Sequence, residues 1–425
     1  MRRFAVAAPP LRVLFASVAA GGGHHTVRDA LVRATQAADP RGERIAVSSW
    51  TSQAGFDNFY RWCVQHGWQW LAYLPTRWFS FAAWVAAFSN PKLLRECVAL
   101  LRRAPPDVVV STHLILTAAL QLARWWVGAS TRVVGVVPDY GVPDRGFFPR
   151  VALFRPDVTW VNGEDTYAFA APRAAPGEVE LLGTLVAEDF TRVREQLARA
   201  GGRTVALKRQ WQAAVAVDWP RVAGLDVTKP TVAFYGGSGF AGQARPVMEA
   251  LLARDDVGAR FNVVVLCGRD EALRASLDAV YGHRAGFAVL GFLPHAKLAA
   301  LYGLTDVPVM GSIAHSSLQE LLETATGPLL VFHVIVGTEP PYLDYLAKHR
   351  LGTYEPDAAR MAALVLEAVG VTSGARWAPL AGGFTARAWA LRDASRERAA
   401  RVADCVLRAA RRQELSAGQP VEKAA

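Results

Sequence analysis

Short apolar runs alternate with helix-length stretches along almost the whole chain. A run of four to eight apolar residues bounded by polar or turn residues is typical of a strand that is buried on both faces. Such runs lie at residues 11–18, 107–111, 132–137 and 158–162, and again from Thr231 onward at 262–267, 288–292, 307–311 and 328–334. The spacers between them are long enough for a helix. The pattern therefore predicts two α/β halves, each a doubly wound parallel sheet with crossover helices.

Each half opens with a strand that leads into a glycine cluster and then into a helix. In the first half, residues 21–23 are glycines and are followed by His24 and His25; in the second half the glycines lie within residues 236–242. Glycine lets the backbone approach a ligand closely, and the N-terminus of the next helix offers free N–H groups to an anion. A tight turn with exposed histidines is the alternative. The repetition of the unit favours binding.

The same pattern divides the chain into three parts. The first Rossmann-like domain is expected over residues 1–185, because the last apolar run of this half ends near Thr184, and the second over residues 186–384. Residues 385–425 form a basic helix and tail. An arginine-rich helix of this kind is most often a solvated face. The alternatives are that it packs back across the first domain or touches an anionic surface.

Composition narrows the class of protein. The chain has 425 residues, of which 52% are hydrophobic and 20% charged, and its formal net charge is +10. These values indicate a folded protein with an anionic partner. No nucleic-acid motif accompanies the charge, so nucleic acid is not expected as that partner. Four scattered cysteines favour buried thiols in the cytoplasm, and prolines and Arg12 interrupt the apolar start, which argues against a signal peptide.

Five segments occur in the same order and spacing as in a known family. They are GGGHHTVRDAL (21–31), DVVVSTHLI (107–115), FYGGSGFAGQ (234–243), VVLCGRDEALRASL (264–277) and VLGFLPHAKLAALYGLTDVPVM (289–310). Together they resemble the monogalactosyldiacylglycerol synthases and processive diacylglycerol glucosyltransferases, which are relatives of the lipid II-forming N-acetylglucosaminyltransferase. The resemblance implies a GT-B fold, with two facing Rossmann-like domains and a cleft between them. It also implies an inverting enzyme at the cytoplasmic face of the membrane, which moves a sugar from a UDP-sugar to a lipid such as diacylglycerol without a cofactor or bound metal.

The resemblance also implies roles for individual residues. His24 matches the family's general base or phosphate contact, the carboxylate of Asp139 is the alternative base, and His113 lies toward the acceptor. An imidazole suits proton transfer because its ordinary pKa is close to neutral pH. His113 could instead be a core histidine, and Glu320 a surface glutamate rather than the acid that grips the ribose. The donor-side residues are Gly22, Gly23, Gly236, Gly237, Ser238, Gly239, Gly291, Phe292, Ser316, Ser317, Glu320 and Glu339.

The sequence departs from the family pattern in three places. The family's K-P-G-G-x-T loop is replaced by SIAHSS (312–317), where two serines could bond a diphosphate and His315 could add charge. The family's G-Q-E-x-x-N becomes GTEPPY (337–342), which keeps Glu339. Its D-x-x-x-H segment keeps Asp139 and loses the histidine. These changes bear most directly on the identity of the sugar.

Residues 56–88 are crowded with tryptophans and other aromatic residues. Tryptophan and arginine together favour the lipid headgroup region, where the ring is partly buried and the charge meets phosphate. This segment is therefore expected to bind an anionic membrane surface beside the lipid acceptor; the alternative is an aromatic core. The residues are Arg61, Trp62, Trp68, Trp70, Arg77, Trp78 and Trp84.

Two other functions fit parts of the sequence. A UDP-sugar epimerase of the same architecture would act without any lipid. A non-catalytic relative that binds lipid or nucleotide would explain the altered SIAHSS segment, although the intact glycine clusters argue against it.

Overall fold

The computed structural model describes residues 9–18, 22–53, 87, 90–137, 156–175, 177–236, 244–254, 256–334, 339–373 and 375–417. They form two compact units. The first holds the described residues up to Leu185 together with those from Ala394 onward, and the second runs from Val186 to Asp393. The chain thus passes from the first unit to the second and returns to the first at its C-terminal end.

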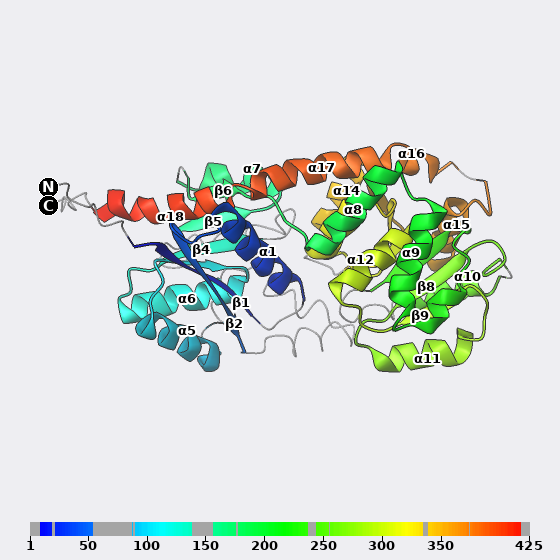
Figure 1. The fold of residues 1–425 in the computed structure, drawn as a ribbon, viewed down its shortest axis with the longest axis horizontal. Helices are drawn as coiled ribbons and strands as arrows, with labels where there is room; N and C mark the ends of the chain where they lie inside the picture. Colours follow the sequence, from blue (N-terminus) through cyan, green and yellow to red (C-terminus); the bar gives the residue numbers. More distant parts are fainter. Residues whose placement is uncertain are drawn as a thin grey trace. The chain divides into compact units, whose positions relative to one another are not determined.

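The described strands of the first unit form a parallel sheet in the order β2-β1-β3-β4-β5-β6 (Figure 1). They are β1 (Leu11–Val18), β2 (Ile45–Ser52), β3 (Val108–Ser111), β4 (Arg132–Val137), β5 (Val158–Val161) and β6 (Val179–Leu181). Its helices are α1 (Gly22–Ala38), α5 (Pro91–Arg103), α6 (Leu114–Val127), α7 (Glu164–Ala170), the short 3-10 helix η3 (Ala171–Arg173) and α18 (Val402–Ala417).

Alternate residues of β1 face two different cores. Leu14 and Val18 pack with residues of α5 and α6 on one side of the sheet, while Val13 and Phe15 pack with α1 and α18 on the other. This alternation is what the two-residue period of a strand requires when both faces are covered. Apolar residues on both faces therefore specify a central strand.

The C-terminal helix completes the first unit. Figure 1 shows α18 beside α1, and its buried residues Val402, Cys405 and Val406 belong to the same core as Phe15. The expectation that the basic tail packs back across the first domain is confirmed for this helix. The alternative that this helix is a wholly solvated face is wrong, because one side of α18 is apolar and buried.

The second unit repeats the architecture with the strand order β12-β11-β10-β7-β8-β9. Its strands are β7 (Thr231–Tyr235), β8 (Asn262–Leu266), β9 (Phe287–Leu290), β10 (Val307–Met310), β11 (Leu329–Val331) and β12 (Gly352–Tyr354). Its helices are α8 (Glu188–Ala200), α9 (Val205–Ala216), η4 (Pro220–Gly224), α10 (Arg245–Leu252), α11 (Glu271–Tyr281), α12 (His295–Leu304), α13 (His315–Glu323), α14 (Pro340–Lys348), α15 (Ala358–Ala368), α16 (Ala378–Ala381) and α17 (Phe384–Ala399), which continues into the first unit.

Two close approaches depend on glycine. A Cβ on Gly183 would lie 1.5 Å from the Ser395 carbonyl oxygen of α17, and the Thr184 N–H donates to Ser395 Oγ at 2.8 Å. A Cβ on Gly303 would lie 2.6 Å from the Trp211 ring, so α12 and α9 pack at short distance. At both positions a glycine is needed because a neighbouring helix packs against it, not because the backbone turns there.

Candidate functional site

The strand order locates a binding edge in the first unit. In a doubly wound sheet, ligands bind at the carboxyl ends of the strands where the order reverses, and here that point lies between β1 and β3. α1 begins just after β1, and α6 just after β3, so their first turns meet at this edge. His24 lies in the first turn of α1 and His113 is the N-cap of α6. Their ring centroids are 4.6 Å apart and their planes make an angle of 73°.

One hydrogen bond fixes the chemistry of His24. Its Nδ1 lies 2.6 Å from the backbone carbonyl of Thr112, while the Thr112 hydroxyl donates to the His24 carbonyl at 3.1 Å. A carbonyl oxygen only accepts, so Nδ1 must carry the proton in this contact. The neutral ring therefore has its lone pair on Nε2. A histidine held in this tautomer can accept a proton from a ligand at Nε2.

The neighbouring histidines stay neutral. Burial, and then the nearby His24, lower the pKa of His113 well below 6.5. Burial, and then the Arg28 charge, also lower the pKa of His25, whose Nδ1 is 2.9 Å from Ser17 Oγ. Neither ring adds positive charge at neutral pH.

An arginine at the same edge was not anticipated from the sequence. Arg28 donates through Nη1 to Ser17 Oγ at 2.9 Å and to the Thr51 hydroxyl, and it pairs through Nη2 with Asp29 at 2.6 Å. Ser17 and Thr51 are the next-to-last residues of β1 and β2, so the guanidinium is held across the ends of two strands. Only its place four residues after His24, on the same face of α1, could have indicated it.

The second unit has the equivalent edge between β7 and β10. Gly236 follows β7 directly, and the Gly311 N–H after β10 donates to the Tyr235 carbonyl at 2.8 Å, which ties the two strand ends together. α13 then begins at His315. Half-buried Ser316 lies in its first turn. Gly236 and Ser316 thus flank the edge where the sheet order reverses.

Two residues of this segment have neighbours that bear on their chemistry. The Ser317 hydroxyl is hydrogen-bonded to the phenol of buried Tyr302, and a hydroxyl can still bond a second group. Burial lowers the pKa of His315 to about 3, with the Arg392 charge acting in the same direction. His315 therefore adds no charge at neutral pH. Its side chain is buried and has no aqueous surface to stabilise the imidazolium.

The acids of α13 are buried. Glu320 is 5% exposed, and burial raises its pKa to about 8 although Arg392 opposes the shift. The alternative that Glu320 is a surface glutamate is therefore wrong. Glu323 is fully buried and accepts from Arg392 Nε at 2.8 Å, while Gln319 accepts from Nη1 of the same arginine. Within α13, Gln319 and Glu320 lie in the second turn and Glu323 is the last residue.

Glu339 is positioned by a serine. It is the N-cap of α14, is 5% exposed, and accepts from Ser312 Oγ at 2.5 Å. Ser312 follows β10 closely, so the contact joins α14 to the edge between β7 and β10. Glu339 is thereby brought near the serine-rich segment 312–317.

Gly291 and Phe292 lie at the end of β9, on the outer side of the sheet. A Cβ on Gly291 would lie 2.8 Å from Trp219 Cη2, so the glycine is required by a packed tryptophan. Phe292 is 56% exposed, with the Arg269 guanidinium 4.8 Å from its ring centroid. The exposed ring and its arginine form an open platform rather than a closed pocket.

Several predicted site residues lie outside the described residues. They are Asp139, Gly237, Ser238 and Gly239, and the membrane-binding set Arg61, Trp62, Trp68, Trp70, Arg77, Trp78 and Trp84. Gly22 and Gly23 are described as the start of α1.

A metal-binding cluster and a membrane-spanning helix are both absent from the described part of the chain. Within it, no cluster of three or more His, Cys, Asp or Glu side chains is arranged to hold a metal ion. None of the described helices is long and apolar enough to cross a bilayer. Cys97, Cys267 and Cys405 are buried free thiols, as expected.

No protein-family model matches the chain, and no curated protein matches it either. Solved structures do. UDP-GlcNAc 2-epimerase from Neisseria meningitidis, bound to UDP-GlcNAc, is 12% identical with a TM-score of 0.55 over 91% of this chain and 100% of its own. MurG of Acinetobacter baumannii is 14% identical with a TM-score of 0.55 over 94% and 100%. MnaA of S. aureus with UDP is 8% identical with a TM-score of 0.59 over 97% and 100%. At these identities the likeness shows the fold, and the expected GT-B class of two Rossmann-like units is confirmed.

Proposed function

We propose that this chain is a peripheral-membrane glycosyltransferase that moves a sugar from a UDP-sugar to the hydroxyl of a lipid such as diacylglycerol, at the cytoplasmic face of the membrane. The observation that carries the proposal is the fixed tautomer of His24, whose Nδ1 is bound to the Thr112 carbonyl at 2.6 Å. A general base needs an unprotonated nitrogen that is held in a constant direction, and Nε2 meets that requirement.

The reaction follows from these groups. The lipid hydroxyl oxygen attacks the anomeric carbon and gives its proton to His24 Nε2. The bond between that carbon and the diphosphate oxygen breaks, and UDP leaves with the electron pair. Attack from the face opposite the leaving group inverts the configuration of the sugar. Arg28 is fixed at the same edge by Ser17 and Thr51, and Asp29 balances its charge, so we assign it no part in ionising the nucleophile.

The donor is assigned to the second unit. The start of α13 and Gly236 flank its switch point, and free backbone N–H groups at a helix N-terminus suit a diphosphate in place of a metal. Two of the similar structures have UDP or UDP-GlcNAc bound, which supports a uridine nucleotide as ligand. The sequence resemblance to diacylglycerol glycosyltransferases supports the lipid acceptor.

Calorimetric titration with UDP, followed by turnover assays, tests the proposal. Purified protein is titrated with UDP and then assayed for UDP release with each common UDP-hexose on vesicles that contain diacylglycerol. His24→Ala should lower turnover roughly 100- to 10,000-fold while UDP affinity stays within about twofold. His283→Ala, on a histidine remote from both switch points, is the matched control and should keep wild-type turnover. Full turnover in His24→Ala would exclude this base, and absence of UDP binding at millimolar concentration would exclude the donor.

A second function is favoured by the structural neighbours, because several of them are UDP-GlcNAc 2-epimerases. An epimerase would invert C2 of UDP-GlcNAc in the absence of any lipid. Nuclear magnetic resonance of UDP-GlcNAc incubated with the protein alone distinguishes the two. A new C2 epimer would replace the transferase proposal, and unchanged UDP-GlcNAc would remove the epimerase.

A further inference from the structure

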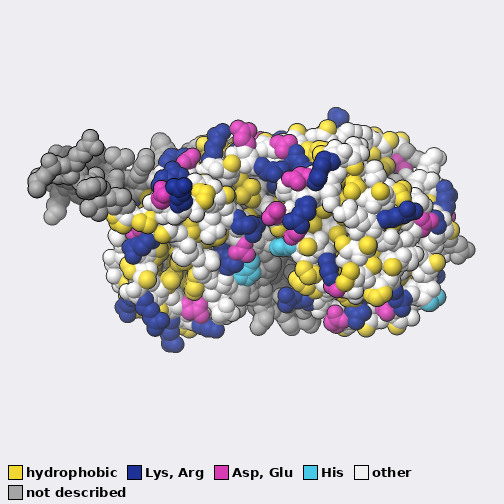
Figure 2. Space-filling view, in the orientation of Figure 1, with side chains coloured by type: hydrophobic (Ala, Val, Ile, Leu, Met, Phe, Trp, Pro, Cys, Tyr) yellow, Lys and Arg dark blue, Asp and Glu magenta, His cyan; other side chains and the backbone are white. Residues whose placement is uncertain are grey.

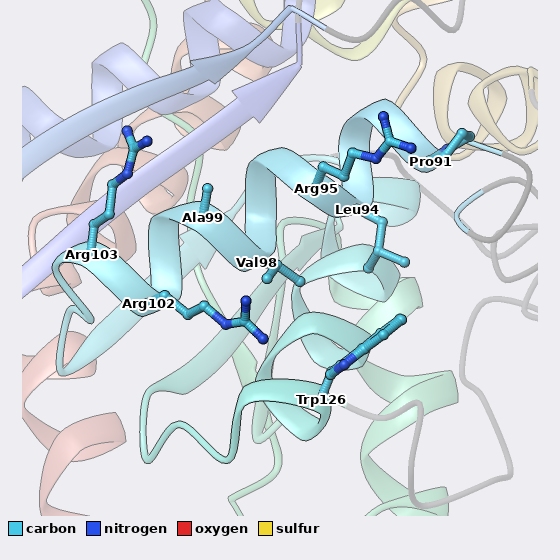
Figure 3. A pocket seen from close by; sticks show the side chains of 8 residues that line it. All are labelled: Pro91, Leu94, Arg95, Val98, Ala99, Arg102, Arg103 and Trp126. Atoms are coloured by element: carbon cyan, nitrogen blue, oxygen red, sulfur yellow. The ribbon is translucent and has the colours of Figure 1, made fainter.

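A groove in the first unit lies apart from both switch points. It is formed between α5 and α6 and has a volume of about 650 Å³. Leu94 and Val98 of α5 point toward the Trp126 ring of α6, and Arg102 lies beside that ring (Figure 3). Arg95 and Arg103 also line it and extend outward from α5 (Figure 3). We call this the α5–α6 groove.

The apolar part of the groove is open to solvent. Trp126, which lines the groove, is 62% exposed, and the adjacent Trp125, which lies beside the groove rather than in its lining, is 66% exposed. They end a helix whose preceding residues 116–123 are buried, so α6 is anchored in the core while its last turn presents two indole rings outward. Adjacent exposed tryptophans of this kind mark an interaction surface rather than a random surface position.

The arginines of the groove have no acidic partner among the described residues. Among the described residues, no carboxylate lies within ion-pair distance of Arg95, Arg102 or Arg103. The only acid on α5, Glu96, instead accepts a hydrogen bond from Ser52 at 2.6 Å. Figure 2 shows Lys and Arg side chains gathered over the α5 end of the first unit. The positive charge is therefore available to an anionic partner.

We propose that the α5–α6 groove docks the protein on an anionic phospholipid bilayer. The indole rings of Trp125 and Trp126 would lie at the headgroup level, where an apolar ring with one N–H donor is most stable. The guanidinium groups of Arg95 and Arg102 would bind lipid phosphates through paired N–H donors. This proposal deepens the proposed function and rests on it, because it names the surface that brings the enzyme to its lipid acceptor.

The mixture of groups favours lipid over other anionic partners. A nucleic acid requires charge along a polar track, whereas here the arginines surround an apolar floor made by Leu94, Val98 and Trp126. A bilayer offers acyl chains to the floor and phosphates to the rim at the same time. α5 also begins just after the tryptophan-rich residues 56–88 in the sequence.

Vesicle flotation with the full-length protein tests the docking surface. The vesicles are phosphatidylcholine alone or phosphatidylcholine with phosphatidylglycerol. The double variant Arg95→Gln/Arg102→Gln should bind the anionic vesicles roughly 30-fold more weakly, because each arginine contributes about fivefold near such a surface. Trp126→Ala should weaken binding about tenfold, since part of a large ring is no longer buried in the interface.

A matched control separates this surface from the overall charge. Arg33→Gln/Arg209→Gln removes the same charge from exposed positions on α1 and α9, and its vesicle binding should stay within about twofold of wild type. Equal losses in both double variants, or wild-type binding by Arg95→Gln/Arg102→Gln, would overturn the proposal. Binding of a DNA oligonucleotide that displaces vesicles and is lost in the same variant would also overturn it.

UDP titration of the same variants keeps the two proposals distinguishable. Vesicle binding that is lost in Arg95→Gln/Arg102→Gln while UDP affinity is unchanged supports the docking surface. Wild-type protein that binds anionic vesicles but not UDP would refute the transferase and leave the docking surface standing. Wild-type protein that binds UDP but neither kind of vesicle would refute the docking surface and the membrane location, and would leave the UDP-sugar donor standing.

Discussion

Removing the Arg392 guanidinium should destabilise the second unit by about 3 kcal/mol. Arg392 is fully buried, and its Nε donates to Glu323 Oε2 at 2.8 Å while Nη1 donates to Gln319. The variant Arg392→Met keeps most of the side-chain length and removes the charge. Glu323, which is also fully buried, would then hold an unbalanced negative charge.

The magnitude follows from what remains around Glu323. Breaking a buried ion pair by removing one partner costs roughly 3–5 kcal/mol. Arg194 Nη1 lies 3.7 Å from Glu323 Oε1 and compensates part of the lost attraction, which places the expected cost near the lower end. The double variant Arg392→Met/Glu323→Gln removes both charges. It should recover at least half of the lost free energy, because no bare charge remains.

Urea unfolding monitored by circular dichroism measures the effect as a change in midpoint at constant slope. Arg192→Met is the control, because Arg192 pairs with Glu188 and Asp189 at an exposed site, and its change should stay below about 1 kcal/mol. The reasoning is refuted if Arg392→Met costs no more than the control. It is also refuted if the double variant is no more stable than the single one.

Three further predictions concern other buried groups. Because burial raises the pKa of Glu320 to about 8, the folded protein retains a proton that the unfolded chain releases near pH 4.5; stability should fall as pH rises from about 5 to 8. Urea midpoints over that range should show a smaller fall in Glu320→Gln, and equal falls would contradict the shift. Gly183→Ala should cost roughly 1–3 kcal/mol in the same assay because its Cβ would meet α17, whereas Gly224→Ala, with open space around it, should be neutral. Burial raises the pKa of the thiols of Cys97, Cys267 and Cys405. Iodoacetamide at pH 8 should therefore leave them unlabelled in the native protein, as measured by mass spectrometry. Rapid labelling would contradict their burial.

The central strands were predictable from the sequence, and the edge strands β2 and β12 were not. Buried strands such as β3 and β8 are nearly continuous apolar runs, which only a sheet covered on both faces requires. β2 has the sequence IAVSSWTS, and much of it is exposed at the sheet edge. β12 contains only three residues. Such strands are specified by pairing with a distant neighbour, which local pattern does not contain.

The sequence predicted which types of residue lie near the glycine clusters of the site, but not the contacts that these residues make. His24 and His113 stood out as histidines after predicted strands, and the strand order explains why they meet. The controlling partner of His24 is the backbone carbonyl of Thr112, which no side-chain pattern reveals. Arg392 was expected in a solvated basic helix, yet it is buried, because α17 packs against α13 through Gln319 and Glu323.

The buried network has a consequence for an anionic ligand at the second switch point. α13 carries Glu320 in its second turn and Glu323 as its last residue, and two bare carboxylates in so short a helix would repel a diphosphate at its N-terminus. Burial keeps Glu320 protonated at neutral pH, and Arg392 balances the charge of Glu323. The N-terminus of α13 then retains its partial positive charge without a lysine beside it. The loss of the family's lysine and glycines in SIAHSS is therefore compatible with a donor site, provided that this internal neutralisation is intact.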